Sequence, residues 1–157
     1  MASRSSSRKA PLADLGGVRL IALPVHDYDG KSWLAVIEGA AVPMRVRRVF
    51  AVFAKRPARR GEHAHRRCAQ FMICLKGRVA IGLDDGRRRK KIALAAPKHG
   101  LLVPPGIWAE QDYAAGSTLL VLCDRPYEAG DYLRDYGAFL RFRGLARTRK
   151  KKTSARR

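Results

Sequence analysis

The sequence lacks a long hydrophobic run, and no stretch approaches the roughly 20 consecutive apolar residues that a membrane-spanning helix requires. Its first twelve residues are rich in Ser and Arg and have no apolar centre like that of a secretory signal. These two absences predict a chain that does not enter a membrane, and we expect a soluble cytoplasmic protein.

Cysteine is scarce as well. The 157 residues include three cysteines, Cys68, Cys74 and Cys123, and no CxxC pair. An odd and small number of cysteines without a framework spacing argues against a disulfide scaffold. We therefore expect three reduced thiols that pack as small apolar groups.

Acidic residues are few: 13 Asp and Glu face 33 Lys and Arg, which gives a formal net charge of +20. Residues 141–157 hold nine of these cations and no acid. The basic body of the chain predicts an anionic ligand. We expect the C-terminal run to be a solvated, disordered tail, because no aromatic residue is interleaved with its charges after Phe142. Weak non-specific contact of this tail with nucleic acid stays open as an alternative.

Short apolar runs, mostly of four to eight residues and rich in β-branched side chains, are what the sequence has in place of long ones. Turn signals such as Asp29-Gly30, Asp85-Gly86 and Pro104-Pro105-Gly106 separate them. Many short strands with such turns predict an all-β sandwich or barrel. The runs are 18–23, 33–37, 46–53, 70–75, 79–83, 91–95, 100–103 and 118–123.

The end of the chain has a different pattern. Apolar residues in 127–143 fall at helical spacing, so we expect one or two short helices to close the fold. The sequence thus predicts a flexible arm over 1–17, a single β domain over 18–140 and the basic tail over 141–157. An apolar content of 46% is enough for one such core.

Two of the four histidines, His63 and His65, lie two residues apart in a basic segment. On a strand this spacing puts both imidazoles on one face. If that face is the barrel interior, a functional site is the simplest reason to bury two polar groups that are costly without partners. The alternative, in which both rings point outward from a basic surface strand, is left open by the spacing.

The HxH pair also resembles part of the metal motif of cupin barrels, so a metal has to be considered. Ala69 and Gln70 stand where that motif has an acid, and no histidine follows the turn at 104–106. Two of four ligands are therefore missing, and we predict no metal. Without metal, an imidazole of ordinary pKa about 6.5 both takes and gives a proton near neutral pH. Such a group suits proton transfer between neighbouring carbons through an enediol.

Several segments, in order across residues 18–140, resemble the bacterial nucleotide-sugar 3,4-ketoisomerases, the WxcM-like cupin enzymes that act on dTDP-4-keto-6-deoxyglucose. The matching segments are Val46-Arg47-Arg48-Val49-Phe50, Arg60-Gly61-Glu62-His63-Ala64-His65, QFMICLKG at 70–77, Leu83-Asp84-Asp85-Gly86, Gly100 to Pro105 with Trp108, and Asp131-Tyr132-Leu133-Arg134 with Tyr136.

This resemblance implies a cupin-type double-stranded β-helix (jelly-roll) barrel, a homodimer, and no metal or organic cofactor. It implies a dTDP-linked 4-keto-6-deoxyhexose as substrate, isomerised to the 3-keto sugar for polysaccharide biosynthesis. His65 would be the principal base and His63 would assist it. The residues expected to bind substrate are Arg60, Arg48, Lys31, Gln70, Trp108 and Glu110.

The chain also departs from the family. Phe50 and Ala51 stand where the family commonly has a pair of tyrosines, and Ala69 replaces a frequent Glu. A nucleotide-sugar-binding protein without turnover, or a related sugar epimerase, is therefore the alternative. A nucleic-acid-binding protein and a metal-dependent cupin such as a dioxygenase are further alternatives.

Overall fold

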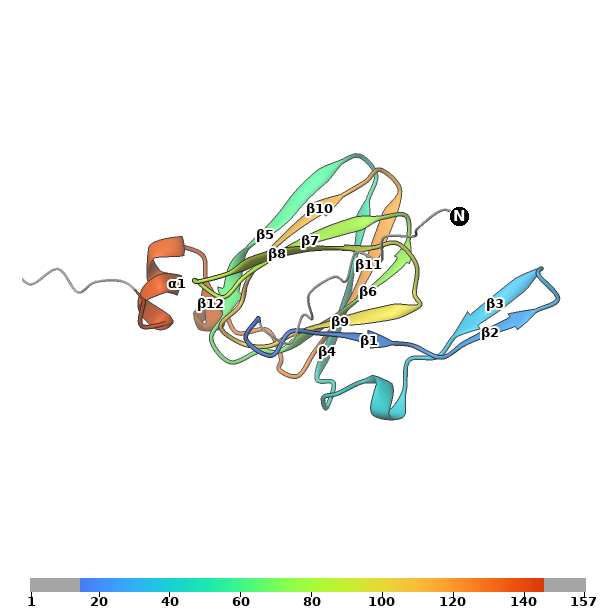
Figure 1. Cartoon of the computed structure of the whole chain (residues 1–157), viewed down its shortest axis with the longest axis horizontal. Helices are drawn as coiled ribbons and strands as arrows, with labels where there is room; N and C mark the ends of the chain where they lie inside the picture. Colours follow the sequence, from blue (N-terminus) through green and yellow to red (C-terminus); the bar gives the residue numbers. More distant parts are fainter. Residues whose placement is uncertain (1–14, 146–157) are drawn as a thin grey trace, which may run out of the picture.

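The computed structural model describes residues 15–145, which form two facing antiparallel sheets and one short helix (Figure 1). One sheet has the strand order β1-β9-β6-β11-β4, and the other has the order β12-β5-β10-β7-β8. The strands are β1 (Arg19–Ala22), β2 (Val25–Tyr28), β3 (Ser32–Ala35), β4 (Arg48–Ala54), β5 (Ala58–His65), β6 (Gln70–Lys76), β7 (Val79–Asp84), β8 (Arg89–Leu94), β9 (His99–Val103), β10 (Trp108–Tyr113), β11 (Ser117–Cys123) and β12 (Tyr132–Leu133).

Most sheet neighbours are distant in the chain, as in a jelly roll, and the two sheets enclose one core. Along β4 and β11 the burial of side chains alternates, because successive residues point to opposite faces of a strand. The predicted all-β jelly-roll barrel with a short C-terminal helical segment is thereby confirmed. The core between the sheets includes Met72, Cys74, Ile81, Leu83, Leu101 and Val121.

The limits of the packed region differ somewhat from the sequence-based boundaries. Leu15 and Val18 are fully buried in the core, so packing begins within the stretch expected to be an arm. At the other end, helix α1 (Tyr136–Phe142) runs past residue 140. The rest of the predicted arm and of the basic tail lies outside the described residues.

Strands β2 and β3 form a separate hairpin that extends away from the barrel (Figure 1). Its turn is held by Asp27, whose Oδ1 accepts a hydrogen bond from the backbone of Gly30 at 3.0 Å. Tyr28, Trp33 and Leu34 on this hairpin are exposed. The hairpin therefore contributes little to the core of the barrel.

The chain closes with a 3-10 turn, η3 (Ala129–Asp131), followed by β12 and α1. Asp135 caps α1, because its Oδ1 accepts a hydrogen bond from the backbone of Ala138 at 2.7 Å. Phe139 from the helix is fully buried against the outer face of the β5 sheet. Within residues 15–145, the only α-helix is this seven-residue one, and no helix is long and apolar enough to cross a membrane.

Candidate active site

His63 and His65 lie at the end of β5 with both rings on the inner face of the barrel. His63 pairs with Ala109 of β10, a core residue, and His65 pairs with Tyr132 of β12. His65 is only 6% exposed. The sequence left open whether the two rings point inward or outward, and in the structure they point inward.

A β-bulge at Gly61 and Glu62 sets the direction of these side chains. Gly61 pairs with Glu110 and His63 with Ala109, so β5 has one extra residue opposite β10. Both bulge residues have positive φ, +85° at Gly61 and 55° at Glu62. Residues three apart on a regular strand face opposite sides, but the bulge lets Arg60 and His63 share the inner face.

A cavity of about 550 Å³ opens beside the histidines, between β4 and β5. This volume is in the range of small-molecule sites. Three of the residues predicted from the sequence line it, namely Arg60, His63 and Gln70. The cavity is also lined by Phe50, Ala51, Gln111, Tyr132 and Arg134.

Asp131 orients His65. Its Oδ2 lies 2.8 Å from His65 Nδ1, and a carboxylate only accepts, so Nδ1 carries the hydrogen. The backbone of Arg67 donates to Oδ1 at 2.7 Å, and that of Cys68 donates to Oδ2 at 3.3 Å. The other ring nitrogen, His65 Nε2, is buried with no hydrogen-bond partner among residues 15–145. Its lone pair is thus available as a base.

The protonation states follow from burial and these contacts. Burial lowers the pKa of His65, although the hydrogen bond to Asp131 opposes the shift. Burial also lowers the pKa of His63, whose Nδ1 donates to the Gly61 carbonyl at 2.9 Å. Burial would raise the pKa of Asp131, but its hydrogen bonds from His65 and the Arg67 backbone outweigh that and lower it. At neutral pH the site thus holds two neutral imidazoles and one carboxylate.

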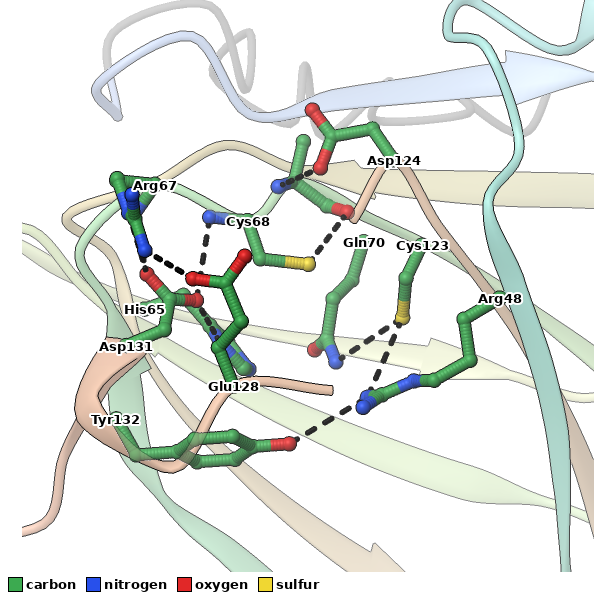
Figure 2. A network of polar contacts seen from close by, with 11 residues as sticks. Arg48, His65, Arg67, Cys68, Gln70, Cys123, Asp124, Glu128, Asp131 and Tyr132 are labelled. Atoms are coloured by element: carbon green, nitrogen blue, oxygen red, sulfur yellow. Dashed lines mark hydrogen bonds and ion pairs between the residues drawn. The ribbon is translucent and has the colours of Figure 1, made fainter. Parts of the chain in front are cut away.

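Tyr132 joins the histidines to Arg48. Its ring centroid is 5.0 Å from that of His63 and 4.4 Å from that of His65. Its hydroxyl accepts a hydrogen bond from Arg48 Nη2 at 3.4 Å, and Figure 2 shows the two side chains pointing toward one another. A hydroxyl that accepts from a guanidinium keeps its own hydrogen to donate elsewhere.

The same nitrogen, Arg48 Nη2, also donates to Cys123, whose Sγ is 3.6 Å away (Figure 2). A hydrogen bond with Cys68 lowers the pKa of the Cys123 thiol to about 6, and the charge of Arg48 acts in the same direction. Gln70 Nε2 contacts the same sulfur at 3.8 Å. Arg48 Nε is buried without a partner among the described residues, so it is free to donate to a ligand.

Four residues predicted to bind substrate do not line this cavity, namely Arg48, Lys31, Trp108 and Glu110, and the predicted base His65 does not line it either. Arg48 and His65 lie directly behind Tyr132, which does line it. Trp108 and Glu110 lie on the outer face of β10, because Ala109 and Gln111 occupy the inner one. The Trp108 ring packs 5.2 Å from Tyr136 of the closing segment. Both residues instead line a separate outer cavity of about 290 Å³ beside β8.

Lys31 lies in the turn of the β2–β3 hairpin, which Figure 1 shows outside the barrel. It is exposed and does not line the cavity of its own chain. Asp131, in contrast, is a site residue that the sequence argument used only as part of a family segment. No spacing rule connects it to His65, 66 residues away.

Comparison with known proteins gives one consistent set of matches. A family model described as WxcM-like, C-terminal, matches residues 16–144. A curated relative from Aneurinibacillus thermoaerophilus, named TDP-4-oxo-6-deoxy-alpha-D-glucose-3,4-oxoisomerase, is 34% identical over 113 residues. That match covers 71% of this chain and 81% of the relative.

Solved structures agree with the sequence matches. A 3,4-ketoisomerase from Helicobacter canadensis has a TM-score of 0.76 and 30% identity, over 81% of this chain and 97% of that one. QdtA, a sugar 3,4-ketoisomerase from Thermoanaerobacterium thermosaccharolyticum solved with TDP, has a TM-score of 0.75 and 34% identity, over 81% and 94% of the two chains. A histidine-to-asparagine variant of QdtA was solved with TDP-4-keto-6-deoxyglucose and has a TM-score of 0.75 and 33% identity, again over 81% and 94%.

Proposed function

Because this chain belongs to the WxcM-like, C-terminal family, we propose that it is a nucleotide-sugar 3,4-ketoisomerase that converts a dTDP-linked 4-keto-6-deoxyhexose to its 3-keto isomer. The observation that carries the proposal is the His65–Asp131 pair, which directs an unprotonated ring nitrogen to the inside of the barrel next to His63. The relatives named above act on TDP-linked sugars or were solved with TDP.

The reaction moves one proton between neighbouring carbons and needs no oxidant. His65 Nε2 takes the proton from C3 of the sugar, and the electrons of that bond form the C3–C4 double bond of an enediolate. Asp131 stabilises the resulting imidazolium, because its carboxylate accepts the hydrogen bond from Nδ1. His63, which lines the cavity, takes up a proton from solvent on Nε2, because its Nδ1 hydrogen is bonded to the Gly61 carbonyl, and delivers that proton to C4. The O3 proton passes to the O4 oxyanion, which completes the 3-keto product, and His65 returns its proton to solvent.

The enediolate oxygen needs donors fixed in advance. Arg48 and Tyr132 are placed for this role, since each is held by the other at 3.4 Å beside the two imidazoles. Gln70, which lines the same cavity, adds an amide donor and acceptor for the sugar hydroxyls. Arg60 at the cavity wall is suited to the diphosphate, because a guanidinium binds phosphate oxygens bidentately.

The phenol that the family commonly places at the strand before the histidines is absent here, since Phe50 and Ala51 line that wall. Tyr132 supplies a hydroxyl in the same cavity from a different strand. Its contact with both imidazoles and with Arg48 favours turnover over a protein that only binds the sugar.

We further propose a cytoplasmic homodimer that acts in polysaccharide biosynthesis. Exposed apolar side chains on the hairpin, Trp33 at 46% and Leu34 at 50%, and Phe53 at 71% on edge strand β4 support a second copy that covers them. A role of Lys31 in substrate binding depends on such an assembly. Trp108 and Glu110 act from outside, by holding β10 against the closing segment and against Arg59. The predicted contact of the basic tail with nucleic acid concerns residues outside the described range.

A proton NMR time course in deuterium oxide with dTDP-4-keto-6-deoxyglucose tests the proposal. We expect deuterium to enter C3 and the 3-keto sugar to appear with the wild type, and neither to occur with His65→Ala. With His63→Ala we expect exchange at C3 to continue while product formation falls. Exchange that survives in His65→Ala and disappears in His63→Ala would reverse the two roles. Line broadening of the sugar without exchange in the wild type would establish a binding protein instead.

A further inference from the structure

Three buried side chains of the kinds that bind transition metals meet at the C-terminal end of β5. His65, Cys68 and Asp131 each offer one ligand atom, and these atoms all lie within 4.8 Å of one another. The exposed fractions of the three residues are 6%, 4% and 3%. Figure 2 shows the three side chains gathered beside Arg67. The proposed reaction uses His65 and Asp131 and gives the Cys68 thiol no role.

The backbone brings this cluster together. Cys68 lies in the short turn from β5 to β6, where its N–H and that of Arg67 donate to the Asp131 carboxylate. The backbone of Arg66 also donates to the Asp131 carbonyl at 2.8 Å. Hydrogen bonds thus tie the Asp131 carboxylate to the turn that carries Cys68 before any ion arrives, which reduces the reorganisation that binding requires.

The donor set is one imidazole nitrogen, one sulfur and one carboxylate oxygen, which is a set that zinc prefers. Bond lengths of about 2.0 to 2.3 Å place the ligand atoms of a tetrahedral site roughly 3.3 to 3.8 Å apart. Replacing the 2.8 Å contact of His65 Nδ1 with Asp131 Oδ2 by two bonds to one ion therefore needs an opening of about 0.5 Å.

We propose that His65, Cys68 and Asp131 form an inhibitory binding site for zinc, which switches off the base of the proposed isomerase. The effect on turnover rests on the function proposed above, whereas the metal site itself does not. It uses only one histidine of the HxH pair, and it differs in this from the cupin metal motif that the sequence fails to match.

The proton changes explain why zinc inhibits. The Cys68 thiol loses its proton to solvent as its sulfur bonds to the ion, and nothing is oxidised or reduced. His65 binds through Nδ1, so the hydrogen of its neutral ring must move to Nε2. That hydrogen occupies the lone pair that would take the C3 proton. Zinc thus removes the base even if the cavity itself stays empty.

The surrounding charges are compatible with a bound cation. Asp131 and the Cys68 thiolate together neutralise the two charges of zinc. Arg67, whose Nε is 3.9 Å from Asp131 Oδ1, also forms an ion pair with Glu128. Arg48 and Arg134 oppose positive charge at His65, so the two anionic ligands have to outweigh them.

The test uses full-length protein without a polyhistidine tag. Zinc is titrated against a chromophoric chelator, and cobalt is used as a spectroscopic substitute, for which a thiolate ligand gives a near-ultraviolet charge-transfer band. We expect one zinc per chain and a cobalt–thiolate band in the wild type. In Cys68→Ser we expect loss of the band and a fall in zinc affinity of at least roughly 100-fold, because losing a direct ligand costs more than the roughly 10 to 100-fold typical of an outer-shell partner.

Cys74→Ser is the matched control. Cys74 is also a buried cysteine, but its sulfur contacts the Lys76 carbonyl at 3.3 Å at the far end of β6. This variant should keep the band, the affinity and the activity. Equal zinc affinity in the two variants, or a wild-type spectrum without the band, would overturn the site.

A second measurement does not depend on how well a variant folds. X-ray absorption of the zinc-loaded wild type should show sulfur at about 2.3 Å in the zinc shell, and a shell of nitrogen and oxygen alone would refute the proposal. Zinc should also abolish turnover of dTDP-4-keto-6-deoxyglucose reversibly, with recovery on adding a chelator. If zinc is bound through sulfur but the protein does not turn over the sugar, the proposed function is wrong and the zinc site stands. If turnover continues with zinc bound, the site stands and its inhibitory effect is wrong.

Discussion

The two faces of strands β5 and β10 carry polar side chains of similar kinds in very different surroundings. On the inner face, His65 is 6% exposed and held by one carboxylate. On the outer face, Arg59 pairs with Glu110 at 2.7 Å, and their side chains are 52% and 35% exposed. Water screens the outer pair, whereas the inner contact fixes a tautomer. Chemical function is therefore concentrated on the inner face.

The bulge at Gly61 and Glu62 produces this division. It turns Arg60 and His63 to the same side although they are three residues apart, while Arg59, at the rim of the cavity, pairs with Glu110 and Asp112 of the outer face. A regular strand would place either Arg60 or His63 among the outer ion pairs. The comparison of the two faces can therefore be tested by changing one face while leaving the other intact.

The largest effect should come from Asp131→Asn. Both oxygens of Asp131 accept hydrogen bonds, Oδ2 from His65 and the Cys68 backbone and Oδ1 from the Arg67 backbone. An amide presents its NH2 group either to His65 and the Cys68 N–H or to the Arg67 N–H. The first orientation removes the bond that fixes the His65 tautomer, the second displaces the turn that positions Asp131, and neither supplies the negative charge that stabilises the imidazolium. We expect kcat to fall roughly 10² to 10³-fold, which is part of the roughly 10² to 10⁴-fold that a well-placed acid or base contributes. Steady-state kinetics on dTDP-4-keto-6-deoxyglucose measures this.

Asp112→Asn is the control on the outer face. Asp112 pairs with Lys91 at 3.1 Å and its side chain is 42% exposed. Its change should leave kcat within about twofold, because an exposed pair contributes at most roughly 1 kcal/mol. Circular dichroism of both variants checks that they fold. Equal losses of kcat in the two variants would contradict the distinction between the faces.

The second prediction concerns the bulge. At Gly61, φ is +85° and an added Cβ would lie 2.7 Å from the Ala109 carbonyl oxygen. Gly61→Ala should therefore destabilise the fold by about 2 kcal/mol or more and should misplace His63. Urea denaturation measures the loss of stability, and the deuterium exchange assay with product formation shows whether His63 is misplaced.

Gly116→Ala separates backbone strain from the steric clash. Gly116 has a similar φ of +75°, but nothing lies within 4 Å of the position of its Cβ. Its replacement should cost only about 1 kcal/mol, with activity unchanged. If both variants lose the same stability and both stay active, the bulge is not what directs the site residues.

The third prediction compares basic residues on the two faces. Arg60 lines the inner cavity, whereas Lys91 lines the outer one. Arg60→Ala should weaken TDP binding roughly tenfold or more, because a hydrogen bond to a charged group is worth about 1.5 to 3 kcal/mol. Lys91→Ala should leave it nearly unchanged. Titration calorimetry with TDP measures both, and a loss confined to Lys91→Ala would place the nucleotide outside the barrel.

The sequence predicted the barrel well because most of its strands are apolar runs. All eight of the predicted runs overlap strands of the structure, and the closing helix is present. Strands β5 and β10 do not stand out in the same way, since their sequences ARRGEHAH and WAEQDY are largely polar. Their inner faces carry the site, so hydrophobic patterning is weakest there.

Contacts between distant segments were beyond the sequence argument. Asp131 is 66 residues from His65, and only the pairing of β12 with β5 brings them together. The family resemblance implies a substrate-binding role for Trp108 and Glu110. The alternation of β10, which turns Ala109 and Gln111 inward, places them on the other face. The register of a strand cannot be known before its neighbours are placed.

The smallest expected effect is a dependence of stability on pH that comes from the inner face. Burial lowers the pKa of His63 in the folded chain, whereas in the unfolded chain it is about 6.5. As pH falls below about 6.5, His63 binds a proton in the unfolded state but not yet in the folded state. The free energy of unfolding therefore decreases until the pH reaches the lowered pKa of the folded state. Replacing His63 with Ala should therefore reduce the slope of stability with pH, by up to about 1.4 kcal/mol per pH unit. Urea denaturation of both proteins between pH 5 and 8, with a chelator present, measures this slope. The range lies above the pH at which Asp131 titrates, because the pKa of Asp131 is lowered. A slope that is the same in both proteins would mean that His63 is as free to protonate as a residue on the outer face.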